Sequence, residues 1–583
     1  MIPVQCMKKL QTILEWALLL FTALLGLKFT NAAGTPEIPA FYGSDAASIF
    51  YGTAPSFLFV FLSALLLLFS LILNRKLNTP SLLWLAAVLC SLPGIANAST
   101  PEMVRQTLTY LAGLGCFAAA VNLQLEKNPA LGKKLIIALL TGGALVLLHG
   151  WHQMLSGMNE LEKFVAEQGL AQQMDETMLR QIASDRLYGP FQLCNTFGGY
   201  LAALLPLALT VAILWAKKKV QPPRPAMFIL GGVVLLLFAV PLWRTGSRGA
   251  VLTLLAGIFA VLFVLFHTKK ARLILAGCGV IAAAAGICMV IFVRGAESMI
   301  FRFDYALAAG KMMFVHPFAG TGWGDFFTDY PALKLLSNDE TPHSPHNLVL
   351  FFGAQSGLAG CLAALTLLAV PLFAGFRKVL RMRKDTGLTD ETFLAAGLLC
   401  SLTVISLNSL IEVGIEVPAY ATLLILLSAL LSCGNTPGSA TTKQQFLTAL
   451  PVGMFALLTL ICSLREMKRE AAFADLYIKS SPVYTKNLNP GTIRKAYLAA
   501  PQDSPYVHRT MANYLAGIGQ LEAAKVCLDK ALELSPEQIG LRRFRVQLCV
   551  ALGLDTGADT AYILRHDPGN PENRKLPGCS TEK

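Results

Sequence analysis

The sequence is poor in charged residues. Asp, Glu, Lys and Arg make up only 14% of its 583 residues, whereas 54% are hydrophobic. Soluble globular proteins carry about 25% charged residues, so this composition excludes a soluble protein of this size. We therefore interpret the chain as a polytopic membrane protein.

The chain also lacks the cysteine spacings of a metal site. Its 13 Cys include no CxxC pair. Most of them lie inside apolar runs, where cysteine behaves as a small buried hydrophobic residue. Cys527 and Cys549 are in the polar C-terminal segment and could approach each other, but we expect no disulfide framework. The sequence predicts neither a zinc site nor stabilising disulfides.

Acidic residues are outnumbered, and the formal net charge is +13. Such an excess can indicate a nucleic-acid partner. Here the basic residues lie in short clusters between apolar runs, where the positive-inside rule places them. Membrane topology accounts for the charge, so we expect no nucleic acid.

Long apolar runs are what the sequence does have. A helix needs about 20 residues to cross roughly 30 Å of hydrocarbon, and runs near this length recur about thirteen times between residues 10 and 464. We predict membrane spans at residues 10–29, 55–73, 81–97, 106–122, 135–151, 191–215, 226–243, 249–267, 272–293, 346–376, 391–410, 417–433 and 446–464.

The basic clusters predict an orientation. With the N-terminus in the cytoplasm, the loops that carry the clusters are cytoplasmic, and the loops at 152–190 and 294–345 are external, as is the C-terminal segment. Apolar residues at near-helical spacing within 152–190 favour an amphipathic helix on the membrane surface. The first span ends like a secretory signal, at Asn31-Ala32-Ala33. It is longer than a signal's apolar region, so we expect it to be uncleaved.

The composition becomes soluble after residue 464. Within residues 505–536, small and large residues follow the spacing of a tetratricopeptide repeat, in which two antiparallel helices pack together. We predict a membrane domain at 1–464 and a helical-repeat domain at 465–583 with a concave surface for a protein partner. A plain helical tail that caps the membrane domain is the alternative. The residues with the repeat spacing are Ala512, Leu515, Gly519, Ala524, Leu528, Ala531 and Pro536.

The long loop (residues 294–345) ends in a polar segment just before the next apolar run. We predict Ser344 as the N-cap of that membrane helix, with Pro345 and His346 in its first turn. The positive end of the helix dipole disfavours an imidazolium there, so His346 is expected to be neutral. A neutral imidazole at the membrane surface suits a general base for a hydroxyl. The alternative is an interfacial histidine bonded to a carbonyl.

A second polar turn lies between two apolar runs, at residues 243–250. Ser247 is placed to cap the following helix, and Arg248 falls in its first turn, where a cation opposes the helix dipole by about 0.3–1 kcal/mol. Helix N-terminal amides and an arginine fork together suit a phosphate, so a bound anion would explain Arg248. The alternative is an arginine that snorkels to the interface.

Within the long loop, Arg302 begins a predicted short helix with Tyr305 on one side, and His316-Pro317 ends it. The glycines of residues 320–324 make a tight turn. This turn is not a dinucleotide fingerprint, because no strand precedes it and the spacing differs. We expect its glycines to let the backbone approach the membrane domain closely.

Four elements occur in a fixed order along the chain. They are Arg186-Leu187-Tyr188-Gly189-Pro190-Phe191 with Asn195, then Ser247-Arg248-Gly249-Ala250, then Arg302 with His316-Pro317 and Gly320-Thr321-Gly322-Trp323-Gly324, and last His346-Asn347 with Gly357. Together they resemble the O-antigen ligase and O-antigen polymerase superfamily of bacterial membrane glycosyltransferases, over residues 180–376. Gln192 and Cys194 depart from that pattern, since Asn and Pro often stand there.

The resemblance implies an all-α bundle of 12–13 membrane helices that transfers a glycan from an undecaprenyl diphosphate carrier to an acceptor hydroxyl. The reaction would take place at the periplasmic face of the bacterial inner membrane. The resemblance implies that Arg186, Arg248 and Arg302 bind the diphosphate and stabilise its charge as it leaves. It also implies that His346 deprotonates the acceptor, with inversion at the anomeric carbon. It implies no cofactor or metal, and the chain has no paired acidic cluster for one. Further candidate site residues are His343, Arg244, Asn347, Glu412 and Glu416.

The resemblance leaves the acceptor open, because ligases, polymerases and protein O-oligosaccharyltransferases share this core. A lipid, a glycan or a protein is therefore the expected acceptor. A transporter of polysaccharide or lipid is the alternative of another class, but transporters tend to show internal repeats and polar residues near the bilayer midplane. A membrane-anchored scaffold would not need about thirteen spans.

Overall fold

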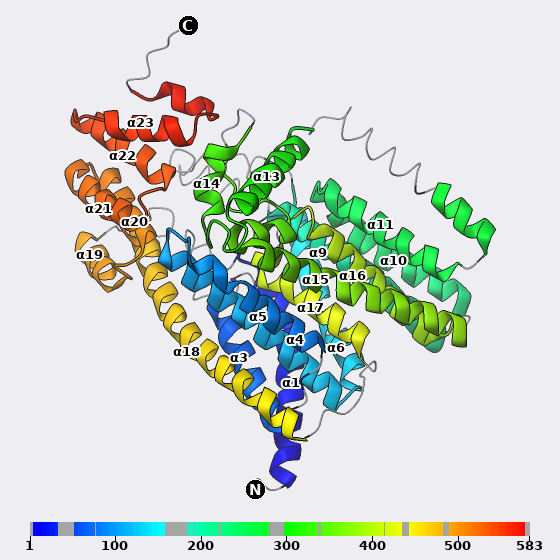
Figure 1. The fold of residues 1–583 in the computed structure, drawn as a ribbon. Helices are drawn as coiled ribbons and strands as arrows, with labels where there is room; N and C mark the ends of the chain where they lie inside the picture. The colour runs from blue at the N-terminus through cyan, green and yellow to red at the C-terminus, as the bar shows by residue number, and fades with distance from the viewer. Residues whose placement is uncertain are drawn as a thin grey trace.

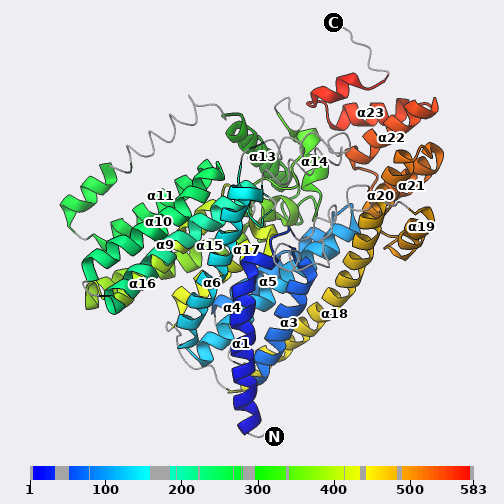
Figure 2. The same ribbon diagram turned by 180° about the vertical axis from the view of Figure 1, so that it is seen from behind.

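The computed structural model describes residues 4–32, 52–75, 77, 79–157, 184, 186–191, 193–220, 223–266, 268–277, 279, 296–335, 340–412, 414–433, 442–481 and 489–577. Every regular element within these residues is a helix, and they contain no strand (Figure 1). The predicted all-α fold is confirmed for this part of the chain. The two termini lie at opposite ends of the molecule, as Figures 1 and 2 both show.

The described residues include ten helices that are long and apolar enough to cross a membrane, which indicates a multi-pass membrane protein. Two shorter apolar helices, α4 and α17, match two more predicted spans. The predicted span at 272–293 and the predicted surface helix within 152–190 lie mostly outside the described residues. The twelve apolar helices are α1 (Val4–Lys28), α3 (Ser56–Leu73), α4 (Thr79–Cys90), α5 (Pro101–Lys127), α6 (Leu131–His152), α9 (Cys194–Lys219), α10 (Pro223–Arg244), α11 (Arg248–Leu265), α15 (Leu348–Thr386), α16 (Asp390–Asn408), α17 (Pro418–Ser432) and α18 (Thr442–Ser480).

Helix α5 is the most enclosed of the ten long apolar helices. It packs against α3, α4, α17 and α18, and 89% of its most apolar stretch is buried. Its sequence explains this, because Ala and Gly fill its middle and small residues let membrane helices approach closely. A Cβ on Gly113, for example, would lie 2.8 Å from the Val60 side chain of α3. In the other half of the bundle α9 packs against α10, α11 and α16.

The long loop contains two helices, α13 (Ala296–Val315) and α14 (Phe326–Leu333). The prediction that a helix begins at Arg302 is wrong, because α13 starts six residues earlier and no helix breaker separates Ala296 from Arg302. Its end just before His316 is as predicted. The two helices share a small core with the start of α15, in which Tyr305, Ala308, Ala309, Met312, Phe326, Tyr330 and Ala354 are buried.

The segment between α13 and α14 folds back onto the membrane helices. Gly357 interrupts α15 at φ 78°, and a Cβ there would lie 2.5 Å from the Pro317 carbonyl oxygen. The N–H of Leu358 donates to that same carbonyl at 2.8 Å. Farther along the loop, the indole N–H of Trp323 donates to the carbonyl of Ser91 at 2.7 Å. The glycine turn therefore lies close to the membrane domain, as its sequence predicts.

The C-terminal domain begins without a break in the helix. Helix α18 runs through the predicted boundary at residue 464, because no Gly or Pro lies between there and Ser480. Helices α20 and α21 pack against each other through residues predicted from the repeat spacing, among them Ala512, Ala524 and Leu528, which are fully buried. The helices after α18 are α19 (Pro490–Ala499), α20 (Pro505–Gly517), α21 (Leu521–Leu534), α22 (Ile539–Leu552) and α23 (Gly557–His566).

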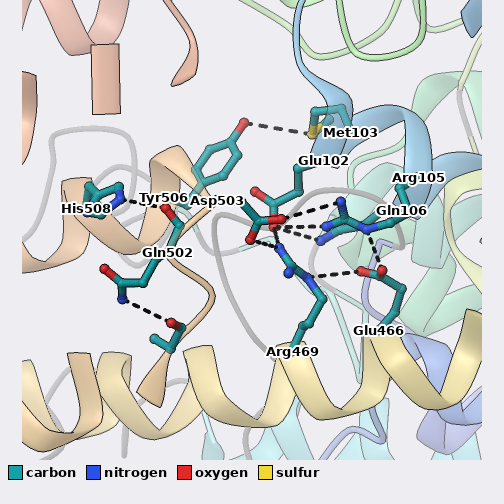
Figure 3. A network of polar contacts seen from close by, with 11 residues as sticks. Glu102, Met103, Arg105, Gln106, Glu466, Arg469, Gln502, Asp503, Tyr506 and His508 are labelled. Atoms are coloured by element: carbon teal, nitrogen blue, oxygen red, sulfur yellow. Dashed lines mark hydrogen bonds and ion pairs between the residues drawn. The ribbon is translucent and has the colours of Figure 1, made fainter. Parts of the chain in front are cut away.

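Charged side chains dock this domain onto the membrane helices (Figure 3). Arg105 of α5 pairs with Glu466 of α18 (Nε–Oε1 2.5 Å). Arg469 of α18 pairs with Asp503 at 2.6 Å and reaches Glu102 of α5 at 3.6 Å. The side chains of Glu466 and Glu102 are only 1% and 5% exposed. Because loss of one partner would leave a buried charge uncompensated, the network holds the domain in a defined orientation.

A second contact joins the C-terminal domain to the long loop. Asp325 and Asp329 lie at the start of α14, and the Glu537 carboxylate is near both. Ser99 donates to Asp325 from its backbone N–H (2.7 Å) and its hydroxyl (2.5 Å). Burial raises the pKa of Asp325 to about 6 and that of Asp329 to about 7, and the neighbouring carboxylates add to both rises.

We expect this contact to weaken as the pH rises. Folding raises the pKa of Asp329 from 3.8 to about 7, so the folded state binds more protons than the unfolded state in this window and loses stability as the pH increases through it. The apparent unfolding temperature of the purified protein should therefore fall between about pH 4 and about pH 7. Asp329→Asn should flatten that fall, and an equally steep fall in the variant would contradict the assignment.

Candidate active site

Helix α15 begins later than its sequence predicts. Its N-cap is Asn347, whose side-chain oxygen accepts the N–H of Leu350 at 3.0 Å. The prediction of Ser344 as N-cap, with Pro345 and His346 in the first turn, is therefore wrong. Asn347 takes the cap position because its Nδ2 also donates a hydrogen bond to the carbonyl of Leu410, at 2.8 Å. No local sequence pattern predicts this long-range hydrogen bond. His346 precedes the cap with φ 51°, an unusual conformation for a residue with a Cβ.

The carboxylate of Glu412 joins two of the predicted site residues. Nδ1 of His346 lies 3.1 Å from Oε2 of Glu412, while the guanidinium of Arg302 donates to Oε1. The Glu412 side chain is only 5% exposed, whereas those of His346 and Arg302 are 27% and 20% exposed. A buried carboxylate needs cationic or hydrogen-bonding partners, and these two side chains provide them. The cluster therefore combines a buried acid with a partly accessible imidazole and guanidinium.

Tyr305 borders the His346 imidazole. The two ring centroids are 5.7 Å apart with a tilt of 31°. The Tyr305 hydroxyl donates a hydrogen bond to the carboxylate of Glu340, which lies near the C-terminal end of the long loop in the sequence. Burial raises the pKa of the Tyr305 hydroxyl well above its ordinary value, and Glu340 adds to the rise, so the hydroxyl stays protonated. Tyr305 thereby forms an uncharged wall of the cluster.

The turn from Arg244 to Arg248 carries two more cations. Ser247 caps α11 as predicted, by accepting the N–H of Ala250 at 3.4 Å, and the side chains of Arg244 and Arg248 are exposed. Arg186 lies against this turn, because its Nε donates to the carbonyl of Thr245 at 2.9 Å. The other end of the Arg186 guanidinium donates to Oδ1 of Asn195 of α9, at 2.8 Å, so the first sequence element and this turn form one unit.

The turn at residues 409–412 connects this unit to the Glu412 cluster. Gly249 of α11 packs directly on it, since a Cβ there would lie 2.7 Å from Cδ1 of Ile411. On its other side, the N–H of Leu348 donates to the carbonyl of Ser409 at 2.8 Å. Gly249, His346 and Arg302, from three of the four sequence elements, therefore contact this turn directly. Arg186 of the first element is joined to it indirectly, through the turn that carries Ser247.

His343 belongs to a different environment from His346. It lines a cavity together with Glu416 and Gln355, and the cavity volume of about 20 Å³ admits one water-sized molecule. Its ring stacks on Phe327, with centroids 4.5 Å apart. Burial raises the pKa of Glu416 to about 7, and the charges of His343 and His346 oppose part of that rise. Glu416 therefore lies with His343 in this cavity, whereas Glu412 binds His346 and Arg302.

Two features of this cluster are missing from the sequence-based prediction. Glu412 is predicted only as a further candidate site residue, not as the partner of His346 and Arg302. Glu340 is not predicted at all. Glu412 follows an apolar run whose end lies on the same predicted face of the membrane as His346. That signal places both residues at one face but does not pair them.

The described residues contain no group of three or more His, Cys, Asp or Glu that could hold a metal ion. No protein-family model matches the chain, and no curated protein matches it significantly.

The new N-cap assignment makes a testable prediction. Asn347→Ala should destabilise the start of α15 by about 1 kcal/mol and speed hydrogen exchange at residues 348–350. Asn347→Asp, which keeps the capping oxygen, should recover most of that loss. Ser344→Ala should leave these amides unchanged, and the opposite ranking would return the cap to Ser344.

Proposed function

We propose that this protein transfers a glycan from an undecaprenyl diphosphate carrier to an acceptor hydroxyl at the periplasmic face of the bacterial inner membrane. The pairing of His346 with Glu412, beside Arg302, is the observation that carries the proposal. The order of the sequence elements, which resembles that of the O-antigen ligase and polymerase superfamily, supports it.

His346 has the surroundings of a general base. A carboxylate at Nδ1 favours the tautomer with a proton on that nitrogen and leaves the lone pair of Nε2 to accept another. It also stabilises the imidazolium that forms when the acceptor hydroxyl is deprotonated. The 27% exposure of the His346 side chain leaves room for an acceptor to reach it.

The arginines supply the charge that a diphosphate requires. Arg302 binds the 409–412 turn from α13, and Gly249, the neighbour of Arg248 in α11, packs on the same turn. Arg186 binds the turn that carries Arg248. A planar guanidinium binds phosphate oxygens in a bidentate manner and stabilises negative charge on a leaving diphosphate. A diphosphate that takes over Arg302 would free Glu412 to interact with the imidazolium of His346 alone, which couples donor binding to activation of the base.

The proposed step is one displacement. The acceptor oxygen attacks the anomeric carbon while the bond from that carbon to the diphosphate oxygen breaks. The diphosphate leaves with the electron pair, and the hydroxyl proton moves to Nε2 of His346. Attack from the face opposite the leaving group inverts the configuration of the anomeric carbon.

We expect His346→Ala to lower transfer by at least about 100-fold, since general base catalysis contributes about 10²–10⁴-fold. Glu412→Gln should lower it less, because the amide oxygen still orients the imidazole but no longer stabilises its charge. The assay uses purified protein in lipid, a polyprenyl-diphosphate glycan, and lipid, glycan and protein acceptors in separate reactions.

His343→Ala is the comparison variant, because His343 is the second candidate base and its ring stacks on Phe327. If His346→Ala transfers glycan at the wild-type rate and His343→Ala does not, His343 is the base.

If no acceptor receives glycan but the lipid-linked glycan crosses the bilayer, the result would favour a transporter. The acceptor that is consumed distinguishes a ligase or polymerase from a protein O-oligosaccharyltransferase.

A further inference from the structure

The C-terminal domain reaches the long loop through a buried ion pair. Lys334 follows the last residue of α14, and its Nζ lies 2.7 Å from Oδ1 of Asp567, which follows the last residue of α23. Both side chains are fully buried. Arg543 of α22 binds the other oxygen of Asp567. Because burying such charges carries a large desolvation cost, stability alone explains this pair poorly.

Contacts continue from α14 to α13. Asp304 of α13 accepts the Tyr330 hydroxyl at 3.0 Å and the backbone N–H of Leu335 at 2.9 Å. Tyr330 precedes Lys334 by one helical turn, and Leu335 directly follows it. The ring of Tyr330 also packs edge-on against Tyr305, with centroids 5.1 Å apart. The end of α14 is therefore held between the C-terminal domain and α13.

Helix α13 carries two residues of the proposed active site. Arg302 and Tyr305 lie within two positions of Asp304, and they contact Glu412 and His346 respectively. Helix α14 lies between α13 and the C-terminal domain in both Figure 1 and Figure 2, and it contacts α13 and α23. An unbroken set of contacts thus leads from the C-terminal domain to the cluster.

We propose that the Lys334–Asp567 ion pair makes the C-terminal domain a positioning element of the active site. The inference rests on the proposed glycan transfer. The pair fixes the end of α14, and Asp304 passes that constraint to α13. Arg302 and Tyr305 then keep their places beside Glu412 and His346. Lys334 and Asp567 themselves touch no substrate.

The test measures structure and transfer on the same full-length protein in lipid. Lys334→Met should speed hydrogen exchange in both α14 and α13 by about tenfold, because both helices lose an anchor. It should also lower kcat by about tenfold with little change in KM for the acceptor, since a displacement of about 1 Å can cost up to about 100-fold. Lys334→Arg keeps the charge and should restore both quantities.

Arg545→Met is the matched control. It breaks a 2.6 Å ion pair with Asp559 inside the same domain, so it tests the effect of losing any such pair. Exchange in α13 and the transfer rate should stay within about twofold of wild type, as expected for independent sites. Should Lys334→Met not fold, Asp567→Asn takes its place, because it keeps an oxygen acceptor for Arg543.

The outcomes separate this inference from the proposed function. Faster exchange in α14 with unchanged exchange in α13 would overturn the coupling, as would an equal loss of kcat in Arg545→Met. If exchange rises in both helices but even the wild-type protein transfers no glycan to any acceptor, the proposed function fails. The positioning of α13 by the C-terminal domain would then still stand.

Discussion

The buried carboxylate of Glu412 is the constraint on which the candidate site depends. With only 5% of its side chain exposed, it requires partners for both oxygens, and it finds them in Arg302 and His346. One side chain thereby joins the loop helix α13 to the start of α15. In the rest of the 409–412 turn, backbone carbonyls accept hydrogen bonds from Asn347 and Leu348, and the Ile411 side chain packs against Gly249. The position of the imidazole follows from this turn rather than from the dipole of α15.

Local patterns predicted the parts of the structure that depend on local physics. Apolar length predicted twelve of the described helices, and repeat spacing predicted the packing of α20 on α21. Ser247 was a correctly predicted cap because it is the last capping residue before its apolar run. Ser344 was a wrong one because Asn347, an equally good capping residue, also bonds to Leu410. The pairing of His346 with Glu412 spans 66 residues and depends on how α15 packs against α16, so the sequence alone could not specify it.

The C-terminal domain is docked by charge. Ion pairs join Glu102 and Arg105 of α5 to Arg469 and Glu466 of α18, and Arg469 also binds Asp503 of the domain. Asp567 of the domain binds Lys334 of the long loop. Buried ion pairs tolerate little displacement, because each charge loses its compensation when its partner moves. Such docking suits a domain that holds neighbouring elements in place. The concave surface of this domain and the binding of a protein partner to it stay predictions.

The central claim is that the turn at 409–412 organises a site where a base meets a lipid diphosphate. A structure of the protein with an uncleavable undecaprenyl-diphosphate glycan bound tests this most directly. The account predicts that the diphosphate contacts Arg248 and Arg302, and that Nε2 of His346 faces the anomeric carbon from the side opposite the leaving oxygen. A diphosphate bound away from both arginines, with the sugar out of reach of His346, would contradict it.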